Sequence, residues 1–348
     1  MSTKIGIFEI KEDWEKKTYL ELINQKLKEF LKNIDIRFFE EPLDEFVAYK
    51  YSDLNIAVIY IKSRITEKVL EKLMNLELVI TRTTGTDHID ILSCQKRGIK
   101  VANSPHYAST TVAEHTIALI FTLSKKIHTS ILKAKMLDFS RTGLLGIDLI
   151  NKTIGIIGTG RIGREVARIA YGIGMNILAY DLSPDKGLEE KYKVRYVSLE
   201  NLLKESDVIV VMVPYYSKTH HMINKENIKL VKDEAMLINT ARGPIVDTEA
   251  IIWALQNGKL KGGIALDVFE GERVLLEMSE VLENKFSPEE YEKALKTIHL
   301  LSYPNTIFTP HVAHYTKDAI KRDIIWVIEN LAEFLKFREL PIRYQFYF

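Results

Sequence analysis

The stretch Thr153-Ile154-Gly155-Ile156-Ile157-Gly158-Thr159-Gly160-Arg161-Ile162-Gly163 decides the fold of this chain. Its first five residues have the length and apolar character of a buried strand, and the pattern G-x-G-x-x-G follows at the start of an amphipathic helix over 161–173. The first glycine permits a tight turn, the second lets the backbone approach a pyrophosphate, and the third lets helix and strand pack closely. The stretch predicts a dinucleotide-binding βαβ unit whose cofactor contacts are Gly158, Gly160, Arg161, Ile162 and Gly163.

The acid after the next predicted strand indicates which dinucleotide binds. That strand covers 176–180, and Asp181 follows it directly. A carboxylate at this place accepts hydrogen bonds from the adenosine ribose hydroxyls and repels a 2′-phosphate. The alternative is a glycine turn beside an incidental helix-capping aspartate. The combination of strand, turn, helix and acid favours NAD over NADP.

Short apolar runs alternate with amphipathic stretches on both sides of this unit. The earlier series predicts strands over 4–8, 34–38, 56–60, 76–80 and 99–102 and helices over 16–31, 66–74 and 88–96. The later series adds strands over 208–213, 236–239, 263–268 and 306–309 and helices over 199–205, 248–256 and 317–336. Both halves therefore predict an α/β fold with a doubly wound parallel sheet.

Three segments stand outside this alternation. A long helix from Thr111, with Glu114 completing a Thr-x-x-Glu capping box, is expected to connect the two halves. The segment 271–299 is charged and helical in pattern and is interpreted as an insertion. The aromatic tail over 342–348 is expected to dock against another surface.

Bulk composition limits the possible functions. A length of 348 residues favours two domains, and 46% hydrophobic with 27% charged residues is typical of a globular protein with a large core. With 48 Lys and Arg against 47 Asp and Glu, and no basic block, neither nucleic acid nor an anionic membrane is expected as a partner. Cys94 is the only cysteine, so the sequence predicts no disulfide and no metal site. The absence of a leader pattern or a long apolar run favours a cytoplasmic location.

Polar side chains at the ends of the later strands suggest chemistry on a carbonyl group. These side chains are Arg242, Asp267, Glu270, Glu272 and, directly after Pro310, His311. Ligands of open α/β sheets bind at the carboxyl ends of the strands. A guanidinium can hold a substrate carboxylate with two hydrogen bonds, an imidazole can exchange a proton, and a carboxylate can orient that imidazole.

Each of these residues also has a structural explanation. A histidine at a strand end is often hydrogen-bonded within the fold, an arginine can be a buried ion-pair partner, and the acids can belong to a solvated loop. Spacing alone leaves the structural and catalytic interpretations open.

A family resemblance favours the catalytic interpretation. The chain is similar to the D-isomer-specific 2-hydroxyacid dehydrogenases. The resemblance extends from about Thr83 to Tyr315, and its segments occur in the same order as in the family. The segments that carry it are Gly158–Gly163 with Asp181, Ile238–Asp247, Ala265–Glu272 and Thr309–His311. The segments Arg82–Asp90 and Val112–His115 and the residue Tyr107 also look like family segments. The form Glu270-Gly271-Glu272, the long insertion and Pro310–Thr316 most resemble the D-lactate dehydrogenase branch.

The resemblance implies a Rossmann NAD-binding domain inserted into a flavodoxin-like catalytic domain. The catalytic domain would comprise 1–107 and 311–348, and the NAD-binding domain 108–310. A homodimer through the NAD-binding domain is implied as well.

The resemblance also assigns residues. Arg242 would bind the substrate, His311 would act as acid and base, and Glu272 rather than Glu270 would pair with His311, because the family's acid lies five residues after Asp267. Substrate contacts are expected from Thr84, Gly85, Thr86, Tyr107 and His314. Further cofactor contacts are expected from Val213, Pro214, Thr219, Thr240, Ala241, Arg242, Asp267 and His311.

We therefore expect an NAD-dependent D-2-hydroxyacid dehydrogenase, with pyruvate and D-lactate as the preferred pair. His314 stands where relatives often carry an aromatic residue, which leaves the side-chain specificity open. The alternatives are a larger or different 2-oxo acid, such as phenylpyruvate, glyoxylate or phosphohydroxypyruvate, and a non-catalytic NAD-sensing regulator.

Overall fold

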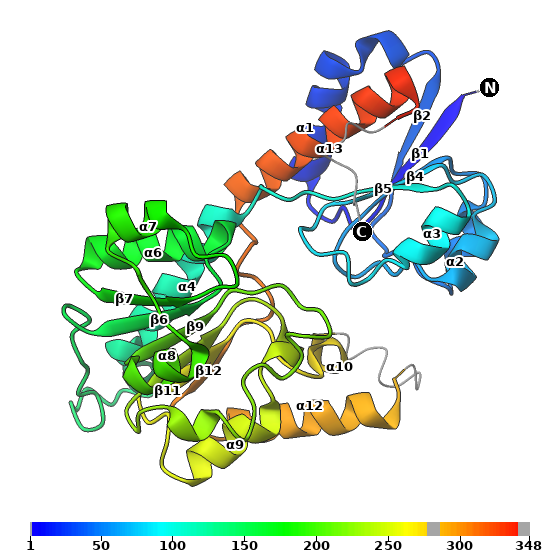
Figure 1. Cartoon of the computed structure of the whole chain (residues 1–348). Coiled ribbons are helices and arrows are strands. Elements are labelled where there is room, and N and C mark those ends of the chain that lie inside the picture. The colour runs from blue at the N-terminus through cyan, green and yellow to red at the C-terminus, as the bar shows by residue number, and fades with distance from the viewer. Residues whose placement is uncertain (1, 277–285, 340–348) are drawn as a thin grey trace. The chain divides into compact units, whose positions relative to one another are not determined.

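The computed structural model describes residues 2–276 and 286–339, which form two compact units (Figure 1). Unit 1 contains the described residues up to Tyr107 and those from Tyr315 onward. Unit 2 runs from Ala108 to His314. Each unit has its own parallel sheet and its own hydrophobic clusters.

The unit 1 sheet has the strand order β2-β1-β3-β4-β5. Its strands are β1 (Thr3–Ile7), β2 (Ile34–Phe38), β3 (Ile56–Ile59), β4 (Leu78–Thr81) and β5 (Lys100–Ala102), and every pair is parallel. The order 2-1-3-4-5 is that of flavodoxin-like folds. One face packs against α1 (Asp13–Lys26) and α13 (Lys317–Phe337), which lie side by side (Figure 1); the other packs against η2 (Ala48–Tyr51), α2 (Glu67–Lys72) and α3 (Ile91–Lys96).

The unit 2 sheet has the strand order β12-β11-β10-β9-β6-β7-β8. Its strands are β6 (Thr153–Ile157), β7 (Asn176–Tyr180), β8 (Arg195–Tyr196), β9 (Val208–Val211), β10 (Met236–Asn239), β11 (Gly263–Leu266) and β12 (Thr306–Phe308). The chain first builds outward from β6 to β8 and then continues on the other side of β6 from β9 to β12. The direction of the strand order reverses between β6 and β9, where Rossmann folds bind dinucleotides.

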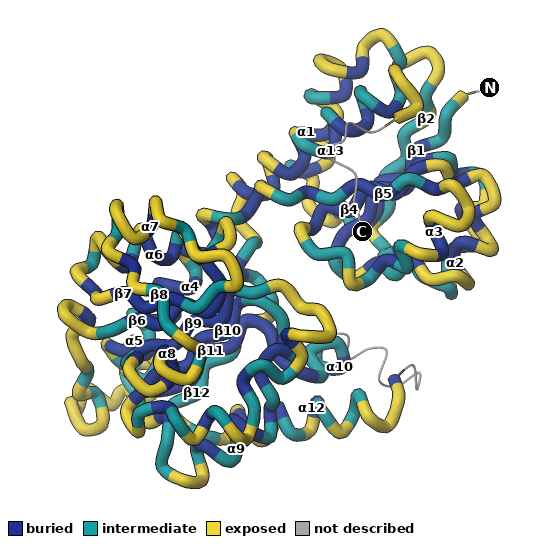
Figure 2. The backbone as a smooth tube through the Cα atoms, viewed as in Figure 1, coloured by how far each residue is buried: buried dark blue, intermediate teal, exposed yellow. Residues whose placement is uncertain are grey.

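Helices cover both faces of the unit 2 sheet. α4 (Ser109–Ser124), α6 (Arg161–Ile173) and α7 (Lys186–Tyr192) pack on one face, and α8 (Leu199–Glu205), η3 (Ile228–Leu230) and α9 (Thr248–Gln256) pack on the other. The remaining elements are η1 (Lys28–Phe30), α5 (Ile127–Lys135), η4 (Gly243–Ile245), α10 (Glu272–Leu276) and α12 (Pro288–Leu301). Figure 2 shows that the buried residues of unit 2 concentrate in its strands and in the helices packed on them, such as α4, α6, α8 and α9. Among the described residues, no helix is both long and apolar enough to cross a membrane.

The predicted α/β class with two parallel sheets is confirmed, but several helix boundaries differ. The capping box expected at Thr111 and Glu114 is wrong: α4 begins at Ser109 after Ala108, which makes no side-chain cap, and Thr111 is buried within the first turn. A capping box occurs instead at the N-terminus of α12, between the N-cap Ser287 and Glu290 in the first turn.

Other boundaries shift because local hydrogen bonds fix the helix ends. The helix predicted over 88–96 begins at Ile91, because Asp90 caps it by accepting the Ser93 N–H. The helix predicted over 16–31 runs from Asp13 to Lys26. Elements α5, α7 and β8 were not predicted, since they are short and only weakly patterned.

The segment expected as an insertion contains α10 and most of α12, and its residues 277–285 lie outside the described part of the chain. The aromatic tail over 342–348 also lies outside it. Unit 2 ends after His314, whereas the sequence suggests a boundary at 310/311. The residues in between stay with unit 2 because the N–H groups of Val312 and Ala313 both donate to the Asp267 carboxylate, at 2.9 Å.

Candidate active site

The three glycines after β6 have the geometry that a pyrophosphate site requires. Gly158 has a φ of +98°, and a Cβ there would lie 2.9 Å from the Met212 backbone. A Cβ on Gly163 would lie 2.0 Å from the Gly158 carbonyl oxygen, so both positions require glycine. A Cβ on Gly160 would meet no described atom within 4 Å. The N-terminus of α6 is therefore open at Gly160, as binding of a pyrophosphate there requires.

Asp181 is held beside this turn. Its Oδ2 accepts the Thr159 N–H at 2.7 Å and the Thr159 hydroxyl at 3.0 Å, and its Oδ1 accepts the Ser183 N–H at 2.9 Å. Burial opposes ionisation, but hydrogen bonds from Ser183 and Thr159 outweigh it and lower the pKa of the Asp181 carboxyl below its ordinary value. Asp181 is thus a fixed negative charge, which suits ribose hydroxyls and opposes a phosphate.

The remaining predicted cofactor residues occupy the turns after β6, β9 and β10. Arg161 is exposed and Ile162 half-buried at the start of α6. Val213 and Pro214 follow β9, and the buried Thr219 hydroxyl donates to the Pro214 carbonyl at 2.7 Å, so Thr219 fixes this turn. Two further residues, Thr240 and Ala241, follow β10 directly.

Arg242, Glu272 and His311 follow three neighbouring strands, β10, β11 and β12. The carboxyl ends of parallel strands lie at the same edge of a sheet, and neighbouring strands are about 4.8 Å apart. Unit 2 therefore presents all three residues at one edge. The Nδ1 atom of His311 lies 3.2 Å from Glu272 Oε1, and the Phe269 N–H donates to Glu272 Oε2 at 3.1 Å. The pair is half-buried, with 16% of the His311 side chain exposed.

Asp267 fixes the loop that carries His311. This carboxylate is buried and accepts the Thr309 hydroxyl as well as the N–H groups of Val312 and Ala313. The His311 N–H donates to the Asp267 carbonyl at 3.0 Å, which holds His311 at a φ of +55°, a value rare for residues with side chains. The family resemblance implies a cofactor contact for Asp267, which stays a prediction, and the structure shows its contacts within this loop.

Sequence reasoning missed two residues that support this edge. The imidazole of His115 lies 3.6 Å from Asp267 Oδ1 and 3.3 Å from the Thr309 hydroxyl. Asn239 is buried at the end of β10, donates to the Arg242 carbonyl at 2.9 Å and accepts the Ala241 N–H at 3.0 Å. The family-like segment Val112–His115 includes His115, but the sequence does not show its partners, because they lie far away in the chain.

The loop carrying Arg242 packs directly on the segment carrying Glu272. A Cβ on Gly243 would lie 2.3 Å from the Phe269 carbonyl carbon, so only glycine permits this approach. The Arg242 guanidinium donates to the Ala241 carbonyl at 2.7 Å. The Thr240 hydroxyl lies 2.8 Å from that of Thr116, which ties the same loop to α4.

Glu270 points to a different histidine from Glu272. Its Oε1 lies 3.1 Å from His221 Nε2, and its Oε2 accepts the Thr248 N–H at 3.0 Å. The His314 ring lies edge-on to His311, with the ring centroids 5.7 Å apart.

The predicted substrate-contacting residues other than His314 belong to unit 1. The Thr84 hydroxyl donates to the Ser104 carbonyl at 3.1 Å, and Asn103 donates to the Thr84 carbonyl at 2.7 Å. Gly85 accepts the Thr83 hydroxyl at 2.6 Å, and Thr86 accepts the Ile89 N–H at 2.9 Å. Tyr107 is buried, and its carbonyl accepts the Arg322 guanidinium at 2.8 Å. The loop at 84–86 is therefore a hydrogen-bonded turn.

Comparisons with known proteins agree with a site of the dehydrogenase type in unit 2. Residues 117–313, more than half of the chain, match the family model of the D-isomer specific 2-hydroxyacid dehydrogenase, NAD binding domain. A 2-hydroxyacid dehydrogenase homolog of Haemophilus influenzae is 36% identical over 319 residues, which cover 91% of this chain and 92% of that protein. An aromatic 2-oxoacid reductase of Clostridium sporogenes is 36% identical over 270 residues, covering 77% of this chain and 78% of that protein.

A solved structure extends the likeness to the whole fold. D-lactate dehydrogenase from Aquifex aeolicus, in complex with NAD and lactic acid, superposes with a TM-score of 0.82 and 37% identity over 95% of both chains. The predicted cofactor, NAD, is thereby confirmed. The open glycine turn and the charge of Asp181 agree with these matches. The chain therefore belongs to the D-isomer-specific 2-hydroxyacid dehydrogenases and is an NAD-dependent oxidoreductase of the D-lactate dehydrogenase type.

Proposed function

We propose that this enzyme reduces a small 2-oxo acid, with pyruvate preferred, to the D-2-hydroxy acid. The observation that carries the proposal is the pair of His311 and Glu272, 3.2 Å apart. These residues follow β12 and β11, and Arg242 follows β10, which is the next strand after β11 in the sheet. An acid-base pair beside a guanidinium supplies the two functions that 2-oxo acid reduction needs, namely a proton for the carbonyl oxygen and a cation for the carboxylate.

In the proposed mechanism, protonated His311 donates its proton to the carbonyl oxygen of the substrate. Glu272 stabilises the imidazolium and fixes its orientation by accepting from Nδ1, so that Nε2 faces the substrate. Arg242 binds the carboxylate and draws electron density from the adjacent carbonyl. NADH, when bound at the glycine turn and Asp181, supplies the hydride to C2. In the reverse direction His311 accepts the hydroxyl proton.

Further assignments come from the family resemblance. We propose that the N–H groups of Thr84, Gly85 and Thr86 bind the substrate carboxylate and that Tyr107 and His314 line the side-chain pocket. His314 would be a smaller and more polar wall than the aromatic residue that relatives often carry, so the size of the substrate side chain is decided by the substrate assay. Two relatives illustrate the alternatives for the substrate side chain. The aromatic 2-oxoacid reductase of Clostridium sporogenes represents a large side chain, and the Aquifex aeolicus enzyme in complex with lactic acid represents a small one.

The substrate proposal is tested by steady-state NADH oxidation with pyruvate, 2-oxobutyrate, phenylpyruvate, glyoxylate, hydroxypyruvate and phosphohydroxypyruvate. We expect the highest kcat/KM with pyruvate and formation of the D-isomer of lactate. A higher kcat/KM with phenylpyruvate would transfer the assignment to aromatic 2-oxo acids. His314→Phe should shift the preference toward the specificity of enzymes that carry an aromatic residue there.

We also propose a cytoplasmic homodimer assembled through unit 2. Large apolar side chains are exposed along one continuous segment of this unit: Ile131, Leu132, Met136, Leu137, Phe139, Leu145 and Ile150. Exposed apolar surface of this extent is typical of an interface. A second copy of the chain can cover it symmetrically, as in most homo-oligomers.

A further inference from the structure

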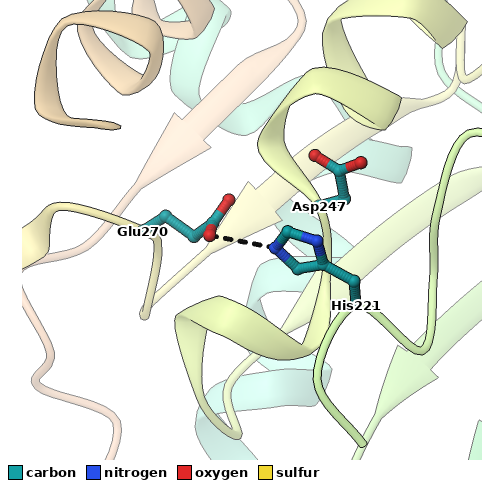
Figure 3. A group of neighbouring side chains, drawn as sticks. All are labelled: His221, Asp247 and Glu270. Carbon is teal, nitrogen blue, oxygen red and sulfur yellow. Dashed lines mark hydrogen bonds and ion pairs between the residues drawn. The ribbon is translucent and has the colours of Figure 1, made fainter. Parts of the chain in front are cut away.

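A second group of metal-binding side chains lies in unit 2, apart from the pair of His311 and Glu272. His221, Asp247 and Glu270 each offer one ligand atom, and these three atoms all lie within 4.8 Å of one another. Figure 3 shows the Glu270 carboxylate beside the His221 ring and the Asp247 carboxylate close to the same ring. The side chains come from the loop before η3, the N-terminus of α9 and the turn after β11.

The backbone of each residue is held in place. The His221 N–H donates to the Pro244 carbonyl, and the Asp247 N–H donates to the Ile223 carbonyl, both at 2.9 Å. The Glu270 carbonyl accepts the hydroxyl of buried Thr297 at 2.8 Å. The three ligand atoms therefore meet on fixed segments, and only side-chain rotations are needed to bring them together.

The charge of the group favours a cation. Glu270 is only 5% exposed. Its Oε1 lies 3.1 Å from His221 Nε2 and its Oε2 accepts the Thr248 N–H at 3.0 Å, so the group consists of one imidazole and two carboxylates. The Lys293 ammonium attracts Glu270, but it forms an ion pair with Glu289 at 2.9 Å and has no lone pair for a metal.

Each carboxylate keeps a ligand atom for a metal. Asp247 caps α9 by accepting the Glu249 N–H at its Oδ1, and its second oxygen can still bind an ion. Glu270 uses Oε2 for the Thr248 N–H, and its Oε1 faces His221.

We propose that His221, Asp247 and Glu270 bind a divalent transition metal, with zinc as the ion taken. Imidazole nitrogen and carboxylate oxygen are both zinc ligands, at about 2.0–2.2 Å, and water can complete a four-coordinate site. The nitrogen ligand disfavours Mg²⁺ and Ca²⁺, which prefer oxygen. The ion replaces the hydrogen bond between His221 and Glu270 with a bond to each of them.

The site has a structural consequence. Asp247 lies on the segment that also carries Arg242, and Glu270 is two residues before Glu272. An ion held by Asp247 and Glu270 would cross-link these segments and the loop of His221, and would stabilise unit 2 because it binds only the folded state. The sequence predicts no metal site, because it contains no thiol pair and the three ligands are widely separated along the chain.

The experiment is a titration of the chelator-treated full chain with ZnCl₂ by calorimetry, and with CoCl₂ by visible absorption. We expect one ion per chain, loss of Co²⁺ absorption on adding Zn²⁺, and a higher Tm in the presence of zinc. The variant Asp247→Asn keeps a good helix cap and removes the charged ligand. Both Asp247→Asn and His221→Asn should weaken binding by at least about tenfold to a hundredfold and abolish the Tm shift.

Two variants serve as matched controls. His220→Asn removes the exposed ring that stacks on His221 with centroids 3.9 Å apart, and Asp185→Asn makes the same change at the cap of α7. Both should bind zinc like the wild type. Unchanged zinc binding in Asp247→Asn and His221→Asn, or an equal loss in His220→Asn, would overturn the assignment. Absence of binding in the wild type would show that His221 and Glu270 form only a hydrogen-bonded pair. None of these measurements requires turnover, so their outcome is independent of the substrate assignment.

Discussion

Glu272 Oε1 lies 3.2 Å from His311 Nδ1, whereas Glu270, two residues earlier, directs its carboxylate to His221 at 3.1 Å. The turn after β11 thus sends two glutamates to two different histidines. This arrangement supports Glu272 as the partner of the acid-base histidine and leaves Glu270 with a separate role.

The first prediction separates these glutamates by the pH dependence of 2-oxo acid reduction. Reduction requires protonated His311, so kcat/KM should fall on the alkaline side of the profile. Glu272→Gln removes the charge that stabilises the imidazolium, so the alkaline limb should move to lower pH and activity at neutral pH should fall. Glu270→Gln should leave the limb in place. If the limb moved only in Glu270→Gln, the assignment of Glu272 would be wrong.

The second prediction concerns the carboxylate anchor. Arg242→Lys should not restore activity, because an ammonium group cannot reproduce the planar two-point contact of a guanidinium. We expect a loss of about 2 to 4 kcal/mol in transition-state stabilisation, measured as kcat/KM for pyruvate. Circular dichroism should match the wild type. Near-normal kcat/KM in a folded variant would exclude Arg242 as the anchor.

The third prediction tests the charge beside the glycine turn. Asp181 should make the enzyme prefer NADH over NADPH, because a 2′-phosphate would face a carboxylate that hydrogen bonds keep ionised. Asp181→Ala should narrow this preference by up to a few kcal/mol, the scale expected of like charges in a partly solvated site. The measurement is the ratio of kcat/KM for the two cofactors. Equal use of both cofactors by the wild type would contradict this role of Asp181.

The fourth prediction concerns the buried ion cluster of unit 1. Arg82 is fully buried and donates to Asp323 at 2.8 Å and to Glu15 at 3.0 Å, so two carboxylates share one guanidinium. Burial raises the pKa of the Asp323 carboxyl to about 6, although Arg82 acts in the opposite direction. In the unfolded chain its pKa returns to the ordinary value of 3.8.

Between about pH 6 and 4 the folded state therefore binds a proton that the unfolded state does not, and this contribution to stability grows as pH falls. Asp323→Asn removes it. The difference in unfolding free energy between wild type and variant should increase from pH 6 to pH 4 in urea denaturation. A difference that decreases over this range would mean that Arg82 keeps Asp323 ionised.

The fifth prediction tests the dimer. Leu137→Asp places a charge on the exposed apolar segment of unit 2, where the leucine is 81% exposed in the single chain. Light scattering should show a dimer for the wild type and a monomer for the variant. Leu182→Asp is the matched control, since Leu182 is 79% exposed and lies outside that segment. A wild-type monomer, or a dimer that persists in Leu137→Asp, would count against this interface.

The sequence by itself determined the parallel α/β class, the glycine turn and Asp181. These features are local, because a strand, a G-x-G-x-x-G turn and the following helix are specified by consecutive residues. It did not specify the ends of short elements: Ala108 begins α4 without a side-chain cap, against the predicted box at Thr111.

Only the tertiary structure decided which distant side chains meet. Arg82 reaches Asp323 across 241 residues, and Glu270 reaches His221 across 49, and neither contact leaves a periodic signal in the chain. Glu270 and Glu272 are the same residue type two positions apart, and in the sequence only the family resemblance distinguishes them. Their partners differ because the backbone turns between them, at Gly271 with its φ of +73°, and the packing of β11 against β10 and β12 fixes where each carboxylate lies.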